Sequence, residues 1–270
     1  MSTRAPEGIR KGAPIIATII ARLRAVGCVF AEDEAQLLAG AARTPENLAA
    51  MVDQRISGLP LEHVLGWAEF CGLRVAVDPG VFVPRRRTEF LVRQAVQRAS
   101  AVSSPVVVDL CCGSGAVGAA LVAALSRVEL HAVDIDPVAV RCARRNLQGH
   151  QVYDGDLYEP LPSSLRGRID VLVANAPYVP TGAIGLLPPE AREHEPLVAL
   201  DGGADGLDVQ RRVAVEAVSW LAPGGHLLVE TSVQQAPQSV RIFADCGLAP
   251  SVAVSEELGG TVVLGRKRTT

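Results

Sequence analysis

The stretch Val106-Val-Val-Asp-Leu-Cys-Cys-Gly-Ser-Gly115 decides the fold of this chain of 270 residues. It begins as a continuous apolar run, which is typical of a parallel strand covered on both faces. Glycines then lead directly into a helical pattern. Such glycines let the backbone turn sharply and approach a ligand, while the N–H groups of the helix start face it. By itself the turn is only a weak indication of a nucleotide-type ligand.

Further apolar runs follow, and helical patterns separate them. The runs span residues 129–133, 171–174 and 226–230, and helices are predicted for residues 137–146 and 209–221. Strands that alternate with helices at this spacing predict an open, doubly wound α/β sheet. Two last runs, 251–254 and 261–264, are separated by a short turn around Gly259 and Gly260. We therefore expect a terminal antiparallel hairpin in the sheet.

The residues before about position 70 have a helical pattern instead. An apolar run from Ala13 to Ala21 is short, ends in Arg22 and Arg24, and is followed by no small-residue cleavage site. It therefore predicts an amphipathic helix and not a signal peptide. A second helix is predicted to start at Thr44-Pro45-Glu46, because a cap residue precedes proline at the first helical position.

A short segment of alternating apolar residues joins the two regions. Between residues 69 and 83 such stretches flank Asp78-Pro79-Gly80, which predicts a hairpin with its turn at these three residues. We therefore expect a small helical domain over residues 1–68, a hairpin linker over residues 69–84 and the α/β domain over residues 85–270.

The composition excludes several classes of function. The 26 basic and 29 acidic residues give a net charge of -3, which argues against a dedicated nucleic-acid binder. No segment is long enough to span a membrane. The six cysteines form no CxxC pair and no Cys/His cluster, so we expect no metal site and reduced thiols in a cytoplasmic protein.

Polar residues at two strand ends add to the glycine turn. Asp134 follows the run 129–133, and a carboxylate there can accept hydrogen bonds from both hydroxyls of a ribose. Asn175 ends the run that starts at Ile169, where a buried amide is costly without partners. Taken singly, Asp134 is equally suited to capping the helix at Pro137, and Asn175 with Pro177 to an ordinary turn. Together with the glycines they predict a ligand crevice.

The segment Asn175-Ala176-Pro177-Tyr178 resembles the Asn-Pro-Pro-Tyr signature of amino-methyltransferases. Asp109 to Gly115, with Asp134, resembles the cofactor half of class I methyltransferases. Four further segments extend the resemblance, over nearly the whole chain, to release-factor glutamine methyltransferases of the HemK type; they span residues 61–66, 69–73, 83–89 and 195–207.

This resemblance implies a Rossmann-like class I methyltransferase domain behind a small helical domain that recognises the substrate. It implies S-adenosylmethionine as the cofactor. It also implies that the acceptor is the glutamine of a Gly-Gly-Gln motif in a peptide chain release factor.

The resemblance also assigns roles to residues. On the cofactor side, Gly113 and Gly115 would contact the amino acid part and Asp134 the ribose. The remaining cofactor contacts would come from Asp109, Cys111, Asp156, Leu157 and Asn175. Of these, Asp156 and Leu157 would lie beside the adenine. Thr88 and Glu89 would help to close the site. On the acceptor side, the amide would be held by Asn175, Ala176, Pro177 and Tyr178.

Four positions depart from the family pattern. Cys111 and Ser232 stand where the family has glycine, and Ala176 and Arg86 stand where it has proline. None of these changes removes a side chain that the chemistry needs. Together they suggest a divergent branch whose acceptor protein can differ.

The mechanism follows from the weak nucleophilicity of an amide nitrogen. Two acceptors, the Asn175 side-chain oxygen and the Ala176 carbonyl, would stabilise positive charge as it develops on that nitrogen. The main alternative is methylation of an exocyclic amine of adenine or guanine in DNA or RNA, which two basic runs favour, Arg85-Arg86-Arg87 and Arg266-Lys267-Arg268. A third is a cofactor-binding protein without turnover. Nucleic acid is not the expected substrate.

Overall fold

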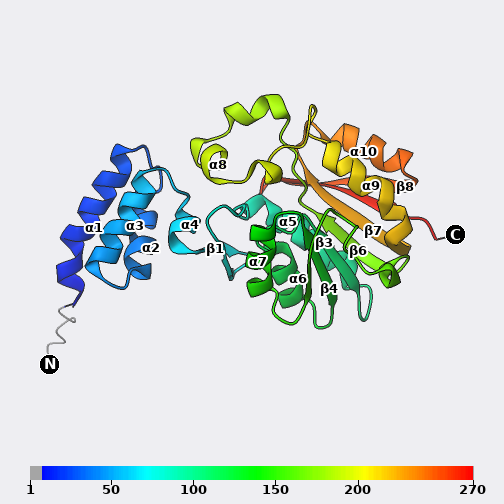
Figure 1. Cartoon of the computed structure of the whole chain (residues 1–270), viewed down its shortest axis with the longest axis horizontal. Coiled ribbons are helices and arrows are strands. Elements are labelled where there is room, and N and C mark those ends of the chain that lie inside the picture. The colour runs from blue at the N-terminus through cyan, green and yellow to red at the C-terminus, as the bar shows by residue number, and fades with distance from the viewer. Residues whose placement is uncertain (1–7, 270) are drawn as a thin grey trace.

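The computed structural model describes residues 8–269, with side chains from residue 14. The first seven residues of the predicted helical domain therefore lie outside the described part. The N-terminal helices stand apart from a large α/β body, and α4 and β1 connect the two (Figure 1).

Three helices form the N-terminal unit: α1 (Gly8–Ala25), α2 (Ala31–Ala41) and α3 (Pro45–Ile56). They enclose a small core of their own, which includes Leu23, Leu38 and Val52. The predicted helix start is confirmed, since the Thr44 hydroxyl accepts the Asn47 N–H at 3.1 Å. A short helix, α4 (Leu61–Leu65), leads into the body. The exact boundary at residue 68 stays a prediction.

The connecting hairpin differs from the predicted one. Strand β1 (Trp67–Phe70) pairs antiparallel with β2 (Leu73–Ala76), so the chain turns at Cys71 and Gly72, both of which have positive φ. The prediction of a turn at Asp78-Pro79-Gly80 with strands on both sides was wrong. The chain does turn there, but the residues that follow bind other partners: Val81 accepts a hydrogen bond from His63, and Val83 donates one to Glu195.

The body is a seven-stranded sheet in the order β5-β4-β3-β6-β7-β9-β8. Five strands are parallel, namely β3 (Val106–Leu110), β4 (Glu129–Asp134), β5 (Gln151–Asp154), β6 (Ile169–Ala174) and β7 (Leu221–Thr231). The antiparallel hairpin of β8 (Leu248–Ser255) and β9 (Gly260–Lys267) completes the sheet beside β7. The predicted doubly wound sheet with a terminal hairpin is confirmed.

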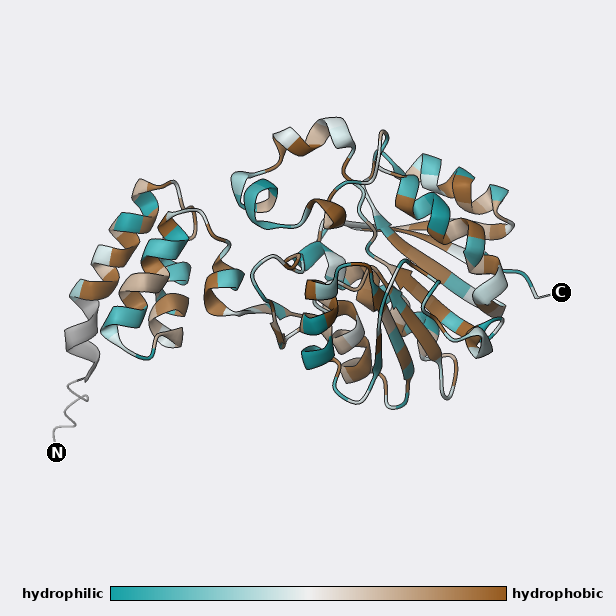
Figure 2. Cartoon of the chain, in the orientation of Figure 1, coloured by the Kyte–Doolittle hydropathy of each residue, from teal (hydrophilic) through white to brown (hydrophobic). Residues whose placement is uncertain are grey.

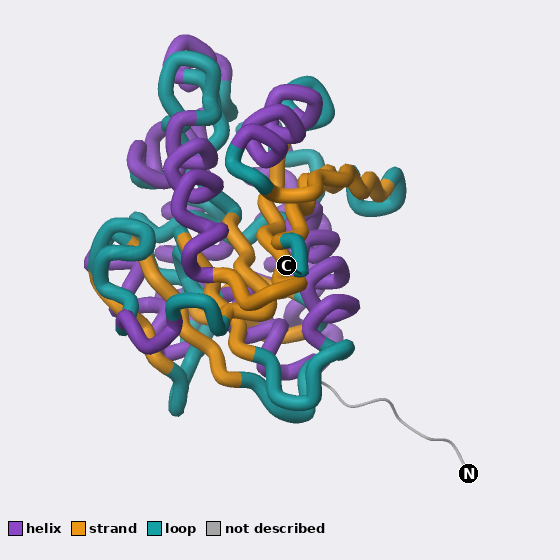
Figure 3. Tube along the Cα trace, turned by 90° about the vertical axis from the view of Figure 1, so that its right-hand side faces the viewer, coloured by secondary structure: helices purple, strands orange, loops and turns teal. Residues whose placement is uncertain are grey.

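Helices cover both faces of this sheet (Figure 3). One face carries α5 (Glu89–Ala99), α6 (Ala116–Ala124) and α7 (Pro137–Asn146), and the other α9 (Asp208–Trp220) and α10 (Ala236–Asp245). Each face of the sheet packs against its helices in a separate hydrophobic core. Successive side chains along a strand point to opposite faces, so Val107 lies in the first core and Val108 in the second. The central strands are consequently apolar almost throughout (Figure 2).

The strand order reverses between β3 and β6, where the chain runs to β4 and β5 on one side and to β7 on the other. In open parallel sheets a crevice forms beyond the strand ends at such a point. A long connection after β6 lies over this crevice. It contains η3 (Thr181–Leu186), α8 (Pro189–His194) and η4 (Leu197–Ala199). Two more short turns, η1 (Arg86–Thr88) and η2 (Ser163–Leu165), lie before α5 and before β6.

Candidate active site

A pocket lies at the crevice, where the carboxyl ends of β3, β4 and β6 meet. It gathers most of the candidate cofactor residues, namely Thr88, Asp109, Cys111, Gly113, Asp134, Asp156, Leu157 and Asn175. Phe82, Pro84, Pro196 and Val198 complete the wall from the two segments that pass over the sheet. Most of the cofactor positions that the sequence indicated one by one therefore share one cavity.

Asp134 anchors the glycine turn. Its carboxylate accepts the Gly113 N–H at 2.7 Å on Oδ2 and the Asp136 N–H at 2.9 Å on Oδ1. Burial raises the pKa of Asp134, and the two N–H donors oppose that shift. Each carboxylate oxygen can accept a further hydrogen bond. Asp134 is thus a fixed acceptor pair at the pocket wall, as ribose hydroxyls require.

Gly113 forms the open side of the turn. Its φ is +55°, and a Cβ added there meets no atom within 4 Å, so it would project into the pocket space. Two neighbours of the turn also hold the left-handed conformation without being glycine, Cys111 at φ 56° and Leu157 at φ 49°. Because position 111 holds the left-handed conformation, which glycine adopts without strain, the family's glycine suits this position.

Asp109 lies under the turn and supports the start of α6. Its side chain is buried, and Oδ2 accepts the Gly118 N–H at 3.0 Å. Burial, together with the negative charge of Asp134, raises the pKa of Asp109 to about 7, although the Gly118 hydrogen bond lowers it.

Two candidate residues lie outside the pocket wall. Gly115 faces Leu147, whose Cδ1 would be 3.0 Å from an added Cβ, so its lack of a side chain lets α6 approach α7. Glu89 accepts the Cys71 N–H at 3.1 Å and so holds the β1–β2 turn. Both residues therefore have structural roles. The geometry does not support the contact with the cofactor that was expected of them.

A second cleft adjoins the pocket and contains the acceptor segment. Ala176, Pro177 and Tyr178 line it opposite Pro60, which lies between α3 and α4, and Leu187 from the segment over the sheet. Asn175 lines both cavities. Its Nδ2 donates to the buried hydroxyl of Thr88 at 3.4 Å, and in this orientation the amide oxygen is available as an acceptor. A methyl donor and an acceptor would therefore meet at Asn175.

Arg87 and Glu230 hold the Tyr178 hydroxyl, and the sequence reasoning missed both. Arg87 donates to the Tyr178 oxygen and to Glu230 Oε1, and the tyrosine hydroxyl donates to the same Glu230 oxygen at 3.3 Å. Only 1% of the Glu230 side chain is exposed. Burial and then the charge of Glu230 raise the pKa of Tyr178, so its hydroxyl stays protonated at neutral pH. The sequence contained one signal for this contact, namely a glutamate within the otherwise apolar run 226–230.

A second buried glutamate fastens the segment over the sheet. Glu195 accepts two hydrogen bonds from Arg85, at 2.7 and 2.6 Å, and one from the Val83 N–H at 3.1 Å. Its side chain is 1% exposed. Burial raises the pKa of Glu195, while the Arg85 charge lowers it. This contact brings Pro196 and Val198 against the pocket.

Within residues 8–269 no three His, Cys, Asp or Glu side chains gather in a way that suits a metal ion. None of the helices in this range combines the length and the hydropathy of a membrane span.

The crevice, the glycine turn and the acidic residue at the end of β4 define a class I methyltransferase. Residues 72–185 match the family model of the methyltransferase small domain. The release factor glutamine methyltransferase of Geobacter sulfurreducens is 38% identical over 228 residues, which are 82% of this chain and 78% of that protein. This chain belongs to the release factor glutamine methyltransferase family and is an N-methyltransferase.

Other relatives show the range of acceptors on this fold. The 4-amino-L-phenylalanine/4-methylamino-L-phenylalanine methyltransferase of Streptomyces pristinaespiralis is 36% identical over 73% of this chain and 69% of that protein. The Thermus thermophilus 16S rRNA N2 G1207 methyltransferase, solved with S-adenosylmethionine and guanosine, is 22% identical. It has a TM-score of 0.53 over 75% of this chain and 50% of that one, which shows a shared fold.

Proposed function

We propose that this chain transfers a methyl group from S-adenosylmethionine to the side-chain amide nitrogen of a glutamine in a peptide chain release factor. The observation that carries the proposal is the position of Asn175, which lines both the cofactor pocket and the acceptor cleft. Family membership supports the choice of acceptor, since the curated relative from Geobacter sulfurreducens carries that name.

The residues of the pocket fit this cofactor. Asp134 supplies acceptors for the ribose hydroxyls, and the missing side chain of Gly113 leaves space for the amino acid part. Asp156 and Leu157 would border the adenine. S-adenosylmethionine, when bound, supplies a methyl group on a positively charged sulfur. No metal is required in this proposal, because the protein needs only to position and polarise the acceptor.

The acceptor residues act through hydrogen bonds. The lone pair of an amide nitrogen is delocalised, so the transition state places positive charge on a nitrogen that is a poor nucleophile in the ground state. The Asn175 oxygen and the Ala176 carbonyl would each accept one N–H of that NH2 group and stabilise the charge. A proline at position 176 is unnecessary, because the acceptor there is a main-chain carbonyl.

Tyr178 would pack against the planar acceptor. Its hydroxyl is occupied by Arg87 and Glu230, so the ring, and not the oxygen, is the part offered to the cleft. With both reactants held at contact distance, positioning can provide roughly 7 kcal/mol or more of the reduction in barrier.

The arginine run argues against a nucleic-acid acceptor. Arg85 and Arg87 are bound to the buried carboxylates of Glu195 and Glu230 and do not form an unpaired basic patch. In the second basic run, Lys267 donates to the Leu221 carbonyl at 2.7 Å. A phosphate backbone would have to compete with these internal partners.

One second acceptor has a specific observation in its favour. The relative from Streptomyces pristinaespiralis is nearly as similar to this chain as the release factor enzyme, and it is named for a free amino acid with an aryl amine. A small aromatic amine is therefore the alternative acceptor that an assay has to include.

The test is methyl transfer by the purified chain from labelled S-adenosylmethionine to three acceptors: a recombinant release factor, the same protein with its Gly-Gly-Gln glutamine changed to alanine, and free 4-aminophenylalanine. We expect label in the first acceptor only, and mass spectrometry to locate it on that glutamine. Label in the glutamine-free protein or in the amino acid alone would reject the proposed acceptor.

Two further parts of the proposal concern domains and location. The N-terminal unit would recognise the release factor, because it lies beside the acceptor cleft: Arg55 of α3 binds Glu190, which lines that cleft. The division at residues 68 and 84 and the cytoplasmic location are proposals of the same kind. Deletion of the N-terminal unit should raise the KM for the release factor while S-adenosylmethionine still binds.

A further inference from the structure

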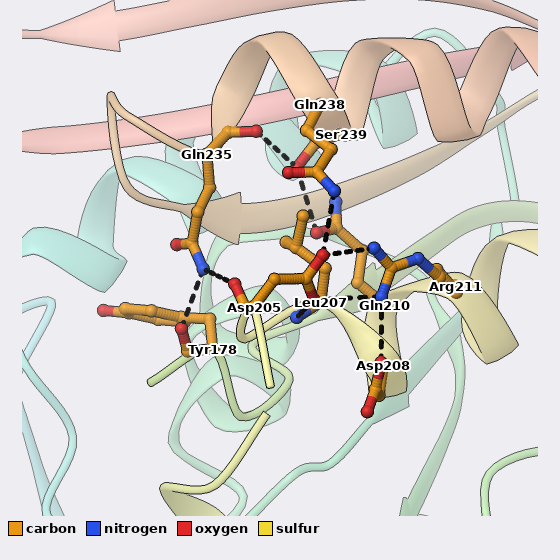
Figure 4. A network of polar contacts seen from close by, with 9 residues as sticks. All are labelled: Tyr178, Asp205, Leu207, Asp208, Gln210, Arg211, Gln235, Gln238 and Ser239. Carbon is orange, nitrogen blue, oxygen red and sulfur yellow. Dashed lines mark hydrogen bonds and ion pairs between the residues drawn. The ribbon is translucent and has the colours of Figure 1, made fainter. Parts of the chain in front are cut away.

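The Gln235 side chain holds the acceptor segment from behind. Gln235 directly precedes α10, yet its Nε2 donates to the Tyr178 carbonyl at 2.9 Å and to the Asp205 carbonyl at 3.0 Å (Figure 4). One NH2 group thus joins two loops that are far apart in the sequence. The next residue after Tyr178, Val179, pairs with the same second loop through its N–H to Leu200 and its carbonyl to Gly202.

The orientation of this amide follows from its partners. Both carbonyl oxygens can only accept, so the nitrogen of Gln235 must face them. Its oxygen accepts the Ser232 hydroxyl at 2.8 Å. Both N–H donors and the oxygen of the amide are therefore occupied, which leaves the side chain little freedom to rotate.

The loop around Asp205, which Gln235 also binds, is held by several further contacts. The Asp205 carboxylate binds Arg211 through both oxygens, accepts the Leu207 N–H at 3.1 Å and accepts Gln238 Nε2 at 2.8 Å (Figure 4). The Arg211 hydrogen bond is the main cause that lowers the pKa of Asp205 to about 2. The ion pair consequently persists over the whole physiological pH range.

Glycine makes the close approach possible. A Cβ on Gly206 would lie 2.3 Å from the Tyr178 carbonyl oxygen and 2.5 Å from Gln235 Nε2, and Gly206 has φ +77°. Any side chain at this position would separate the amide from the acceptor segment. The loop is thus shaped to bring Tyr178 and Gln235 together.

We infer that Gln235 is a positioning residue for methyl transfer: by fixing the Tyr178 carbonyl it sets where the Ala176 carbonyl and the Tyr178 ring meet the acceptor amide. The inference rests on the proposed function. Tyr178 is then held at both ends, with Gln235 on its main chain and Arg87 on its hydroxyl. Gln235 itself lines neither the pocket nor the cleft.

The experiment compares Gln235→Met with Gln238→Met in the full chain. Gln238 lies on α10, which Gln235 precedes, and it also binds the loop, but only through the Asp205 side chain, so it is a matched control without contact to the acceptor segment. Because misplacement by about 1 Å can cost about 100-fold in rate, we expect Gln235→Met to lower kcat on the release factor by about 10- to 100-fold. Its affinity for S-adenosylhomocysteine in calorimetry should stay within about twofold. Gln238→Met should keep its kcat within about twofold.

A second readout does not depend on turnover. Hydrogen–deuterium exchange of the backbone amides of Val179 and Gly202 should become faster in Gln235→Met and stay unchanged in Gln238→Met. Unchanged exchange and unchanged kcat in Gln235→Met would overturn the inference, and so would equal effects of the two variants. If the unaltered chain methylates no release factor, the proposed function fails, and exchange alone decides whether Gln235 fixes the segment.

A third variant tests the polarity of the contact. Gln235→Glu keeps the shape but offers a carboxylate to two carbonyl oxygens, which repel it. Protonation restores one donor, so its kcat relative to the unaltered chain should rise as the pH falls from about 8 to about 6. A constant ratio over this range would count against the hydrogen bond as the cause.

Discussion

Arg87 donates hydrogen bonds from Nε and Nη2 to the Tyr178 hydroxyl, at 3.0 and 2.7 Å, and its Nε also lies 3.1 Å from Glu230. The tyrosine of the acceptor segment is thus bound to a buried carboxylate through a half-exposed arginine. Arg87→Met would leave Glu230 buried without its cation. We expect the free energy of unfolding to fall by about 1 to 3 kcal/mol, less than for a fully buried pair because Arg87 is 42% exposed.

Urea unfolding at pH 7 measures this loss, and Arg86→Met is the matched control. Arg86 is the exposed neighbour of Arg87, and within residues 8–269 its side chain has no hydrogen bond or ion pair. Its replacement should change the stability by less than about 0.5 kcal/mol. Equal losses in the two variants would show that Arg87 does not stabilise Glu230.

Gly113→Ala should weaken cofactor binding, because the added methyl group enters the pocket. The control is Gly149→Ala, since both glycines have positive φ and both have free space around an added Cβ. The two variants share the backbone strain of about 1 to 2 kcal/mol and differ in whether the methyl meets the ligand. Calorimetry with S-adenosylhomocysteine should show an affinity loss of about 10-fold or more for Gly113→Ala alone. Similar affinities in both variants would place the ligand elsewhere.

Asn175→Ala should lower turnover on the release factor by about 100-fold, because its oxygen stabilises charge that develops on the acceptor nitrogen. Cofactor affinity should change far less. Ala176→Pro keeps the carbonyl and should leave turnover within about threefold. Steady-state kinetics and calorimetry distinguish the two effects. Normal turnover in Asn175→Ala together with its loss in Ala176→Pro would refute the mechanism.

Thr88→Val tests whether the Asn175 amide needs its orienting partner. Thr88 is buried and its hydroxyl accepts from Asn175 Nδ2 at 3.4 Å. Valine has nearly the same shape but no oxygen, so the amide is free to turn, and kcat should fall by about 10-fold. Thr88→Ser keeps the hydroxyl and should retain most of the activity. If the two variants had the same kcat, the hydrogen bond would have no part in the reaction.

The raised pKa of Asp109 predicts that the stability of the protein depends on pH. Its pKa is about 7 in the folded protein and 3.8 for an ordinary aspartate, so the folded protein keeps a proton between those values that the unfolded chain loses. The free energy of unfolding therefore falls as the pH rises through this window, by up to about 1.4 kcal/mol per pH unit. Asp109→Asn should remove the slope.

Urea unfolding at about pH 5 and about pH 8 checks this sign. The Asn variant should gain stability relative to the unaltered chain at the higher pH, whereas Asp154→Asn, an exposed aspartate on β5, should show no such gain. Parallel pH profiles for Asp109→Asn and the unaltered chain would contradict the prediction.

The sequence predicted the sheet and the ends of its strands well. Asp134 and Asn175 were found because polar residues directly after buried strands meet at one edge of a parallel sheet. That rule needs no knowledge of the loops. The rule does not cover Glu230, which was overlooked because it stands inside the strand β7 and not after it.

The contacts made by the loops between helices and strands could not be predicted from the sequence. Arg85 with Glu195 and Gln235 with Tyr178 join residues 110 and 57 positions apart, and nothing in the local pattern indicates either pair. The hairpin was misplaced because both Cys71-Gly72 and Asp78-Pro79-Gly80 form turns. Only the partners of the following residues decide which turn is flanked by paired strands.

The position of Glu230 has a consequence for biosynthesis. Its strand, β7, borders β9, which follows it in the chain by about thirty residues, so this edge of β7 stays uncovered until β9 has been made. Until residues 260–267 have joined, β7 exposes a row of unpaired backbone groups beside the acceptor site, which invites pairing with another chain. Chains that lack β9 should therefore aggregate and depend on chaperones.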